Sequence, residues 1–288
     1  MINEQNWIEV NVNINPSLLD TISNDIFSLG ADGLEEADDL VKIYFQSQQW
    51  NESKLNLLVE TISRFNPDFN SSYIHTKNIP FQDWTENWKE NFKLFNLTDE
   101  IIIKPDWNAY QPQKSEIVIT ISPKMAFGTG HHETTQLVML MMQKYLKKGQ
   151  RLMDAGTGSG ILAILAAKLG ADEITVFDND PVAAENTKEN FLQNNINIKH
   201  NIICGVLDDI EQSEYDIIVA NIDRCVLLGM PGKFLDYIKP GGKLILSGLL
   251  SRDEDKILTA YEEFNWKVVE KDQKGAWIVL VLTNNKHE

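Results

Sequence analysis

Hydrophobic and polar residues near the start of the chain follow patterns that predict a strand, a helix, two strands and a second helix. The segment WIEVNVNI, Trp7–Ile14, has the period of two that is typical of a half-buried strand. Apolar residues then recur at helical spacing up to Leu29, and Gly30 ends that helix. This order predicts a small α+β domain of the ferredoxin-like kind over residues 1–65. Its other expected elements are strands over Gly33–Glu36 and Leu40–Phe45, a hairpin turn over Ala37–Asp39 and a helix over Glu52–Arg64.

An aromatic stripe lies in the segment 66–93, which we expect to be a linker. Trp84, Trp88 and Phe92 recur at every fourth position, and this spacing places three rings on one face of a helix. We interpret the segment as an amphipathic linker helix docked on a neighbouring core, in preference to a row of rings that recognises a ligand. After it, DEIIIKPDW and SEIVITISP predict two strands that flank a turn with proline and glutamine.

From Gln150 onward, strand-like and helix-like segments alternate. Such alternation is typical of a doubly wound α/β sheet with parallel strands. The end of the chain differs, because WKVVEKD and GAWIVLVL are separated by a short turn and predict an antiparallel hairpin. We therefore expect a Rossmann-like domain over residues 94–288 that ends in this hairpin. Its expected strands are Arg151–Asp154, Glu173–Asp178, Asn201–Cys204, Asp216–Ala220 and Lys243–Ser247, and its helices are Gly160–Leu169, Pro181–Asn195, Cys225–Ile238 and Asp253–Phe264.

Composition narrows the class of protein. The chain has 26 Lys plus Arg against 42 Asp plus Glu, a net charge of −16. This charge repels a phosphate backbone and attracts a basic protein, so we expect no direct binding of nucleic acid. The sequence has neither an apolar run of roughly 18 residues nor a signal core near its start, and we expect a cytoplasmic protein without membrane contact. Cys204 and Cys225 lack the spacing of metal ligands, so we expect buried thiols and no metal.

Two acids and a glycine cluster mark the expected ligand site. Parallel strands bind ligands at their carboxyl ends, and Asp154 and Asp178 end the first two strands of the expected sheet. Between them, Gly156 and Gly158 belong to a G-x-G-x-G run that permits a tight turn and close backbone approach. A dinucleotide fingerprint needs its third glycine at Ile161. S-adenosylmethionine, with a ribose diol for Asp178 and an ammonium group for Asp154, therefore fits better than NAD. A glycine-rich turn without a ligand is the plain structural alternative.

The segment FGTGHHETT predicts a glycine-bearing loop that enters a helix over Glu133–Lys144. Thr134 and Thr135 lie in the first turn, where free N–H groups and hydroxyls bind a carboxylate or cap the helix. Adjacent histidines point in different directions, and no third ligand is apparent, so HHE does not indicate a metal site.

Asn221 ends the fourth expected strand, at the same edge of the sheet as the two acids. Its side-chain oxygen is suited to accept an N–H from a target amine, whose lone pair then faces a methyl donor. Asp223 either attracts an ammonium group or, as we prefer, caps the next helix. A free lysine has a pKa near 10.4, so roughly one in a thousand is neutral at pH 7. Positioning by Asn221 in line with the methyl group is sufficient without a general base, for which His131 and His132 are the only candidates.

These motifs carry a family resemblance. DAGTGSG followed by VFDND resembles the first two motifs of the class I S-adenosylmethionine-dependent methyltransferases, whose sheets also end in an antiparallel strand. MAFGTGHHETT, Met125–Thr135, and VANI, Val219–Ile222, resemble the ribosomal protein methyltransferase family that modifies the eleventh protein of the large subunit. The similarity covers roughly residue 81 to the end of the chain. Other amine-methylating families have an Asn-Pro-Pro-aromatic motif where this chain has NIDR.

The resemblance implies a protein N-methyltransferase that transfers methyl groups from S-adenosylmethionine to the lysines and terminal amine of a basic large-subunit ribosomal protein. The N-terminal domain would grip that protein, and we expect a monomer. Three alternatives are the same chemistry on another protein or a small amine, a non-catalytic S-adenosylmethionine-binding assembly factor, and an NAD-dependent oxidoreductase. The implied cofactor contacts are Thr135, Gly156, Asp178 and Asn221, with Phe127 and Gly128 in an element that folds over the cofactor near its methyl group.

Overall fold

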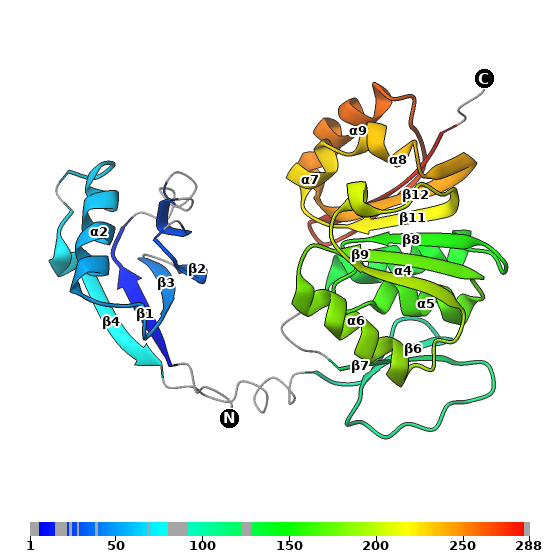
Figure 1. Cartoon of the computed structure of the whole chain (residues 1–288), viewed down its shortest axis with the longest axis horizontal. Helices are drawn as coiled ribbons and strands as arrows, with labels where there is room; N and C mark the ends of the chain where they lie inside the picture. The colour runs from blue at the N-terminus through cyan, green and yellow to red at the C-terminus, as the bar shows by residue number, and fades with distance from the viewer. Residues whose placement is uncertain are drawn as a thin grey trace. The chain divides into compact units, whose positions relative to one another are not determined.

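A computed structural model describes residues 6–14, 22, 25–27, 29–37, 40–67, 69–79, 92–122 and 128–284. The chain divides into two compact units, Met1–Glu90 and Asn91–Glu288. The aromatic linker helix expected from Trp84 and Trp88 falls on residues 80–91, outside the described part. The first unit contains a four-stranded sheet, and the second contains a seven-stranded and a three-stranded sheet (Figure 1).

The first unit is the expected ferredoxin-like domain. Its four-stranded sheet has the order β2-β3-β1-β4, and every neighbouring pair is antiparallel. One face of the sheet packs against helix α2, and Val10, Phe45, Leu58 and Ile62 are fully buried there. Ile22 and Ile26, which are helical, join the same core. The elements are β1 (Trp7–Val12), β2 (Gly33–Ala37), β3 (Leu40–Gln46), α2 (Glu52–Ser63), the 3₁₀ turn η2 (Ser71–Tyr73) and β4 (Ile74–Ile79).

Strand β4 lies beyond residue 65, the boundary expected for the first domain. It pairs with β1 along its whole length, from Trp7 opposite Ile79 to Val12 opposite Ile74. Its side chains are mostly exposed, so its sequence IHTKNI lacks the apolar alternation by which a strand is recognised. The fold of the first unit therefore includes part of the segment that we expected to be linker.

The second unit is a doubly wound sheet of the expected Rossmann-like kind. Its seven strands have the order β10-β9-β8-β11-β12-β14-β13. The first five are parallel to one another, and β14 runs antiparallel to both β12 and β13, which confirms the terminal hairpin. The strands are β8 (Arg151–Ala155), β9 (Glu173–Asp178), β10 (Lys199–Cys204), β11 (Tyr215–Asn221), β12 (Ile238–Leu250), β13 (Lys267–Lys274) and β14 (Trp277–Thr283).

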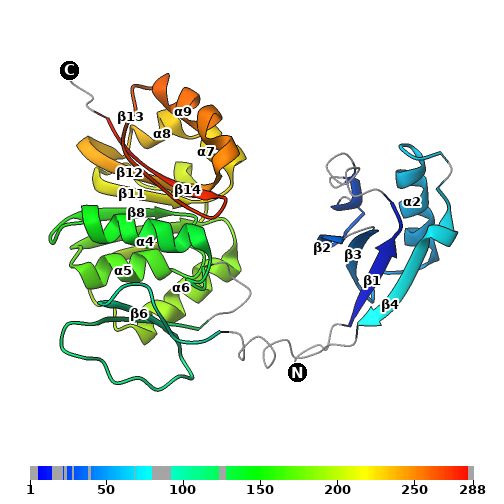
Figure 2. The same cartoon turned by 180° about the vertical axis from the view of Figure 1, so that it is seen from behind.

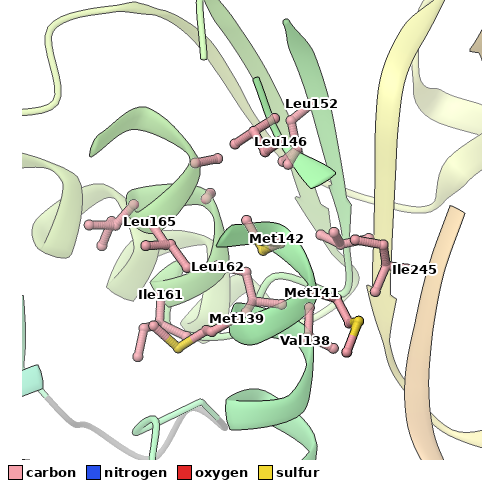
Figure 3. Packing of buried hydrophobic residues seen from close by; sticks show 14 of the residues in the cluster. Val138, Met139, Met141, Met142, Leu146, Leu152, Ile161, Leu162, Leu165 and Ile245 are labelled. Atoms are coloured by element: carbon pink, nitrogen blue, oxygen red, sulfur yellow. The ribbon is translucent and has the colours of Figure 1, made fainter. Parts of the chain in front are cut away.

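Helices cover both faces of this sheet (Figures 1 and 2). One face packs against α4, α5 and α6, and Met139, Met142, Leu162 and Ile245 meet in its core (Figure 3). The other face packs against α7, α8 and α9. Side chains alternate between the two cores along the inner strands β8, β9, β11, β12 and β14, as they must where a sheet is buried on both sides. The helices are α4 (Glu133–Tyr145), α5 (Ile161–Leu169), α6 (Pro181–Gln193), α7 (Arg224–Leu228), α8 (Pro231–Phe234) and α9 (Glu254–Glu262), with 3₁₀ turns η3 (Leu207–Asp209) and η4 (Ser251–Asp253).

Three local expectations were wrong. The helix expected over Cys225–Ile238 is two short helices, because Pro231 cannot donate a helical hydrogen bond and starts α8 instead. Strands β6 (Ile101–Pro105) and β7 (Ile117–Ile121) pair in parallel beside β5 (Phe95–Asn96), so residues 106–116 form a crossover where we expected a turn. Cys204 and Cys225 are exposed thiols.

Candidate active site

A cavity of about 560 Å³ opens at the carboxyl ends of β8, β9, β11 and β12. Strand β8 pairs with β9 on one side and with β11 on the other, so the residues after these strands are neighbours. The cavity is lined by four predicted site residues, Gly156, Gly158, Asp178 and Asn221. The other lining residues are His132, Thr134, Phe177, Asn179, Gly205, Val206, Leu207, Ile222, Asp223, Val226, Met230, Gly248 and Trp277.

The glycine elbow between β8 and α5 is tied to the neighbouring strand β9. The N–H groups of Gly156 and Thr157 donate to the carbonyl oxygen of Phe177 at 2.9 and 3.1 Å. Gly156 has a φ of +73°, and a Cβ there would overlap Cγ2 of Ile222. Glycine is required at this position both for the left-handed backbone and for the space.

Asp178 is held by backbone donors at both carboxylate oxygens. The N–H of Gly158 donates to Oδ2 at 2.9 Å, and the N–H of Asp180 donates to Oδ1 at 3.0 Å. A carboxylate oxygen accepts more than one hydrogen bond. The side chain is therefore fixed in place on the cavity wall and retains capacity to accept hydrogen bonds from hydroxyl groups of a ligand.

Asp154 lies beneath the elbow and not on the cavity wall, although its position in the sequence led us to place it at the rim. Its side chain is fully buried. The hydroxyl of Thr157 donates to Oδ2 at 2.8 Å, and Oδ1 has no hydrogen-bond partner in the described part of the chain. Burial raises the pKa of this carboxyl to about 7, and the charge of Asp178 acts in the same direction, while the Thr157 hydroxyl and the backbone N–H of Ala163 oppose both. One oxygen of this buried carboxyl therefore lacks a close donor among the described residues, which is costly.

Asn221 and Thr135 meet where the first turn of α4 passes the end of β11. The Asn221 Nδ2 donates to the Thr135 hydroxyl at 3.4 Å, although 86 residues separate them. The Asn221 Oδ1 is buried and has no hydrogen-bond partner among the described residues. Thr135 itself is 1% exposed and does not line the cavity. One long hydrogen bond thus orients the amide through its nitrogen, and no described group donates to its oxygen.

The two histidines before α4 have different surroundings. The ring of His131 packs against Phe92 and Phe95 at centroid distances of 4.7 and 4.3 Å, and burial lowers its pKa. His132 caps the helix, because its Nδ1 accepts from the Thr134 N–H at 3.3 Å, and its ring packs on Trp277. Both rings therefore have structural contacts. Among the described residues, no group of three or more metal-ligating side chains is clustered.

Gly128 does not line the cavity but is bonded to the glycine elbow. The Ser159 hydroxyl donates to the Gly128 carbonyl oxygen at 2.5 Å, and the Asn190 Nδ2 donates to the Ser159 carbonyl oxygen at 2.8 Å. Asn190 also accepts from the N–H of Ser122 at 2.9 Å. These bonds hold the chain on both sides of residues 123–127, which include Phe127 and lie outside the described part.

Asp223 confirms the capping interpretation, because its carboxylate accepts from the Cys225 N–H at 2.7 Å at the start of α7.

Sequence reasoning missed Gly248 and the apolar wall of Val226, Met230 and Trp277. Gly248 has a φ of +81°, and a Cβ there would overlap the backbone oxygen of Ile222. Its position near the end of β12 was a usable signal, since Gly156, Asp178 and Asn221 also lie at strand ends.

The chain is similar to known proteins over most of its length. The family model of ribosomal protein L11 methyltransferases, PrmA, matches residues 6–285. A ribosomal protein L11 methyltransferase of Acetivibrio thermocellus is 33% identical over 307 aligned positions, which cover 96% of this chain and 97% of that protein. One from Desulforapulum autotrophicum is 37% identical and covers 72% of this chain and 69% of its own.

A solved structure is also similar. The crystal structure of a ribosomal protein L11 methylase from Lactobacillus delbrueckii subsp. bulgaricus is 34% identical, with a TM-score of 0.63, and covers 67% of this chain and 100% of that chain. In the part of this chain that the structure describes, no helix has the length and apolar character of a membrane span. With the family model matching nearly the whole sequence, the chain belongs to the ribosomal protein L11 methyltransferase family.

Proposed function

We propose that this protein transfers methyl groups from S-adenosylmethionine to amines of ribosomal protein L11. The observation that carries the proposal is the position of Asn221, which lines the cavity at the strand ends and whose buried Oδ1 has no hydrogen-bond partner among the described residues. An amine N–H of the substrate would supply the missing donor. Family membership supports the reaction and the substrate protein.

Residues of this cavity fit S-adenosylmethionine, which supplies a methyl group on a cationic sulfonium. Asp178, which two backbone N–H groups hold in place, would accept from the ribose diol. Gly156 and Gly158 let the ligand approach the backbone. Asp154 would act from beneath the elbow, through water, on the cationic amino group, because its Oδ1 has no partner among the described residues.

Asn221 would hold the target amine, and its apolar neighbours would keep that amine neutral. Val226, Met230 and Trp277 line the same cavity, and removal of water by such walls disfavours the ammonium form. Placement of the nitrogen near 3 Å from the methyl group, in line, supplies much of the rate enhancement. The Thr135 hydroxyl would hold the amide in the required orientation.

The proposal extends to the amines that are methylated and to the part of the chain that binds L11. We propose that lysine side chains and the terminal amine of L11 are methylated, that the first unit binds L11, and that the enzyme acts as a monomer in the cytoplasm. The negative charge of the chain, −16, suits a basic partner. Deletion of residues 1–79, which removes all four strands of the first sheet, would abolish preference for L11 over a short lysyl peptide.

Methyl transfer is tested with the purified chain, L11 and S-adenosylmethionine. We expect L11 to gain mass in whole methyl groups, and fragment spectra to place them on amines. Binding of S-adenosylmethionine without any mass gain would instead support the assembly-factor alternative. Saturable binding of NAD at the same cavity would contradict the proposed cofactor.

Binding of the cofactor should release protons from Asp154. Burial raises its pKa to about 7, above the ordinary 3.8, so the folded chain binds this proton more tightly than the unfolded chain does. The corresponding stability is present at low pH and is lost as the pH rises from 3.8 towards 7. A cationic amino group nearby lowers the pKa again, and at pH 7 about half a proton should leave per cofactor bound.

Calorimetric titration in buffers of different ionisation enthalpy measures this release. Asp154→Asn should bind the cofactor with no release at pH 7, because the amide has no proton to lose. An equal release from both proteins would show that Asp154 is not the titrating group.

A further inference from the structure

A small pocket lies on the open face of the first sheet. Val10, Val12, Ile43 and Phe45 point into the core on the other face, so the alternate residues of the same strands form the open face. The pocket measures about 260 Å³ and is lined by Trp7, Asp32, Gly33, Tyr44 and Ile79.

Gly33 keeps the face of the Tyr44 ring uncovered. The two residues are direct partners in the pairing of β2 with β3. A Cβ at position 33 would stand 3.6 Å from Cδ2 of Tyr44, in ordinary contact with the ring, and the backbone of Gly33 is not left-handed. The backbone therefore does not require glycine here. What glycine provides is an open ring, and the Asp32 N–H, which donates to the Tyr44 carbonyl oxygen at 2.8 Å, keeps the acid beside it.

Negative charge surrounds this ring. The Tyr44 hydroxyl donates to Glu35 at 2.6 Å and, more weakly, to Glu9 at 3.4 Å, which increases the electron density of the ring. Burial and these two carboxylates raise the pKa of Tyr44 well above its ordinary value.

Two lysines of this face lie near those carboxylates. Lys42 bonds to Glu35 at 3.1 Å, and Lys77 stands opposite Glu9 in the pairing of β4 with β1. Asp32 has neither an ion pair nor a side-chain hydrogen bond within the described part of the chain. It is therefore the carboxylate at the pocket that is available to a ligand.

We propose that this pocket binds one cationic side chain, lysine or arginine, of the protein substrate, an inference that rests on the proposed function. Aromatic faces attract cations, and here two rings and the Asp32 carboxylate converge on a cavity of side-chain size. The charge of the pocket is complementary to a basic partner, as is the net charge of −16. The pocket would thus hold the substrate protein at a point outside the methyl-transfer cavity.

Substitutions at the pocket test the proposal in the full-length chain. Gly33→Val fills the space beside the ring in a backbone conformation that valine accepts, and Asp32→Asn removes the charge with little change of shape. His75→Ala, an exposed residue of β4 on the same face, is the control. The measured quantities are the dissociation constant of unmodified L11, from equilibrium titration, and kcat at saturating L11.

Gly33→Val is expected to weaken L11 binding about tenfold, and Asp32→Asn by a similar factor at low salt. Neither should change kcat or the affinity for S-adenosylmethionine, and His75→Ala should match the wild type. Unchanged L11 binding by a folded Gly33→Val would overturn the proposal, and thermal melting of the first unit establishes whether it folds. If Gly33→Val weakened L11 binding and Asp32→Asn did not, the occupant of the pocket would be apolar. That result would overturn the proposal of a cationic side chain. A failure of the proposed function would give a different result: the wild-type chain would then bind L11 without methylating it.

Discussion

Asn221→Ala is expected to lower kcat for L11 methylation on the order of a hundredfold, while the dissociation constant of S-adenosylmethionine stays nearly unchanged. The variant removes the buried Oδ1 that has no partner in the described part of the chain. If that atom orients the amine, its loss lets the nitrogen rotate away from the methyl group. Binding of the cofactor depends mainly on Asp178 and the glycine elbow and should survive.

Single-turnover kinetics and calorimetric titration of the cofactor separate the two effects. Thr135→Val removes the hydroxyl that accepts from Asn221 Nδ2 at 3.4 Å, and it should give a smaller loss of kcat in the same direction. Asn201→Ala, an exposed asparagine on β10, is the matched control and should behave as wild type. Normal turnover by Asn221→Ala would remove the proposed role of this residue.

Gly248→Ala should lower the free energy of unfolding of the second unit by about 3 kcal/mol, as the sum of left-handed strain and overpacking. The methyl group would overlap the backbone oxygen of Ile222, and φ at this position is +81°. Because the obstacle is backbone next to Asn221, the loop after β11 must move. Cofactor binding and turnover should fall together with stability.

Gly241→Ala is the control, because it makes the same substitution at another glycine with a left-handed backbone. Its φ is +75°, but a Cβ there meets nothing within 4 Å. Only the conformational strain remains, about 1 kcal/mol. Thermal melting of the second unit, monitored by Trp fluorescence and circular dichroism, compares the two variants. Equal losses would show that strain, and not contact with Ile222, makes glycine necessary at position 248.

Gly156 shows how an overlap with a side chain differs from the overlap with backbone at Gly248. A Cβ at this position would overlap Cγ2 of Ile222, which is a side-chain atom and not backbone. A smaller residue at position 222 would therefore relieve the overlap at Gly156, while no side-chain replacement at that position relieves the overlap at Gly248.

Several features of this protein could be predicted from local sequence alone. The alternation of strand-like and helix-like segments located the strands and most helices of the second unit, because side-chain periodicity follows directly from backbone geometry. The expected helix start at Glu133 and the strand end at Asp178 agree with the structure. Since parallel strands present their carboxyl ends together, the same patterns predicted that Gly156, Asp178 and Asn221 would share one cavity.

Other features depend on contacts between distant segments. Strand β4 exists because its exposed, polar sequence pairs with β1, and the parallel pairing of β6 with β7 depends on how the crossover packs. The chain order of the elements likewise could not show that Asp154 lies under the elbow, that Thr135 holds Asn221 across 86 residues, or that Gly248 faces Ile222. Local sequence determined which elements form, because backbone preferences and periodicity act over a few residues. Tertiary packing decided which atoms remain without partners at the site, because burial and hydrogen bonding depend on the whole fold.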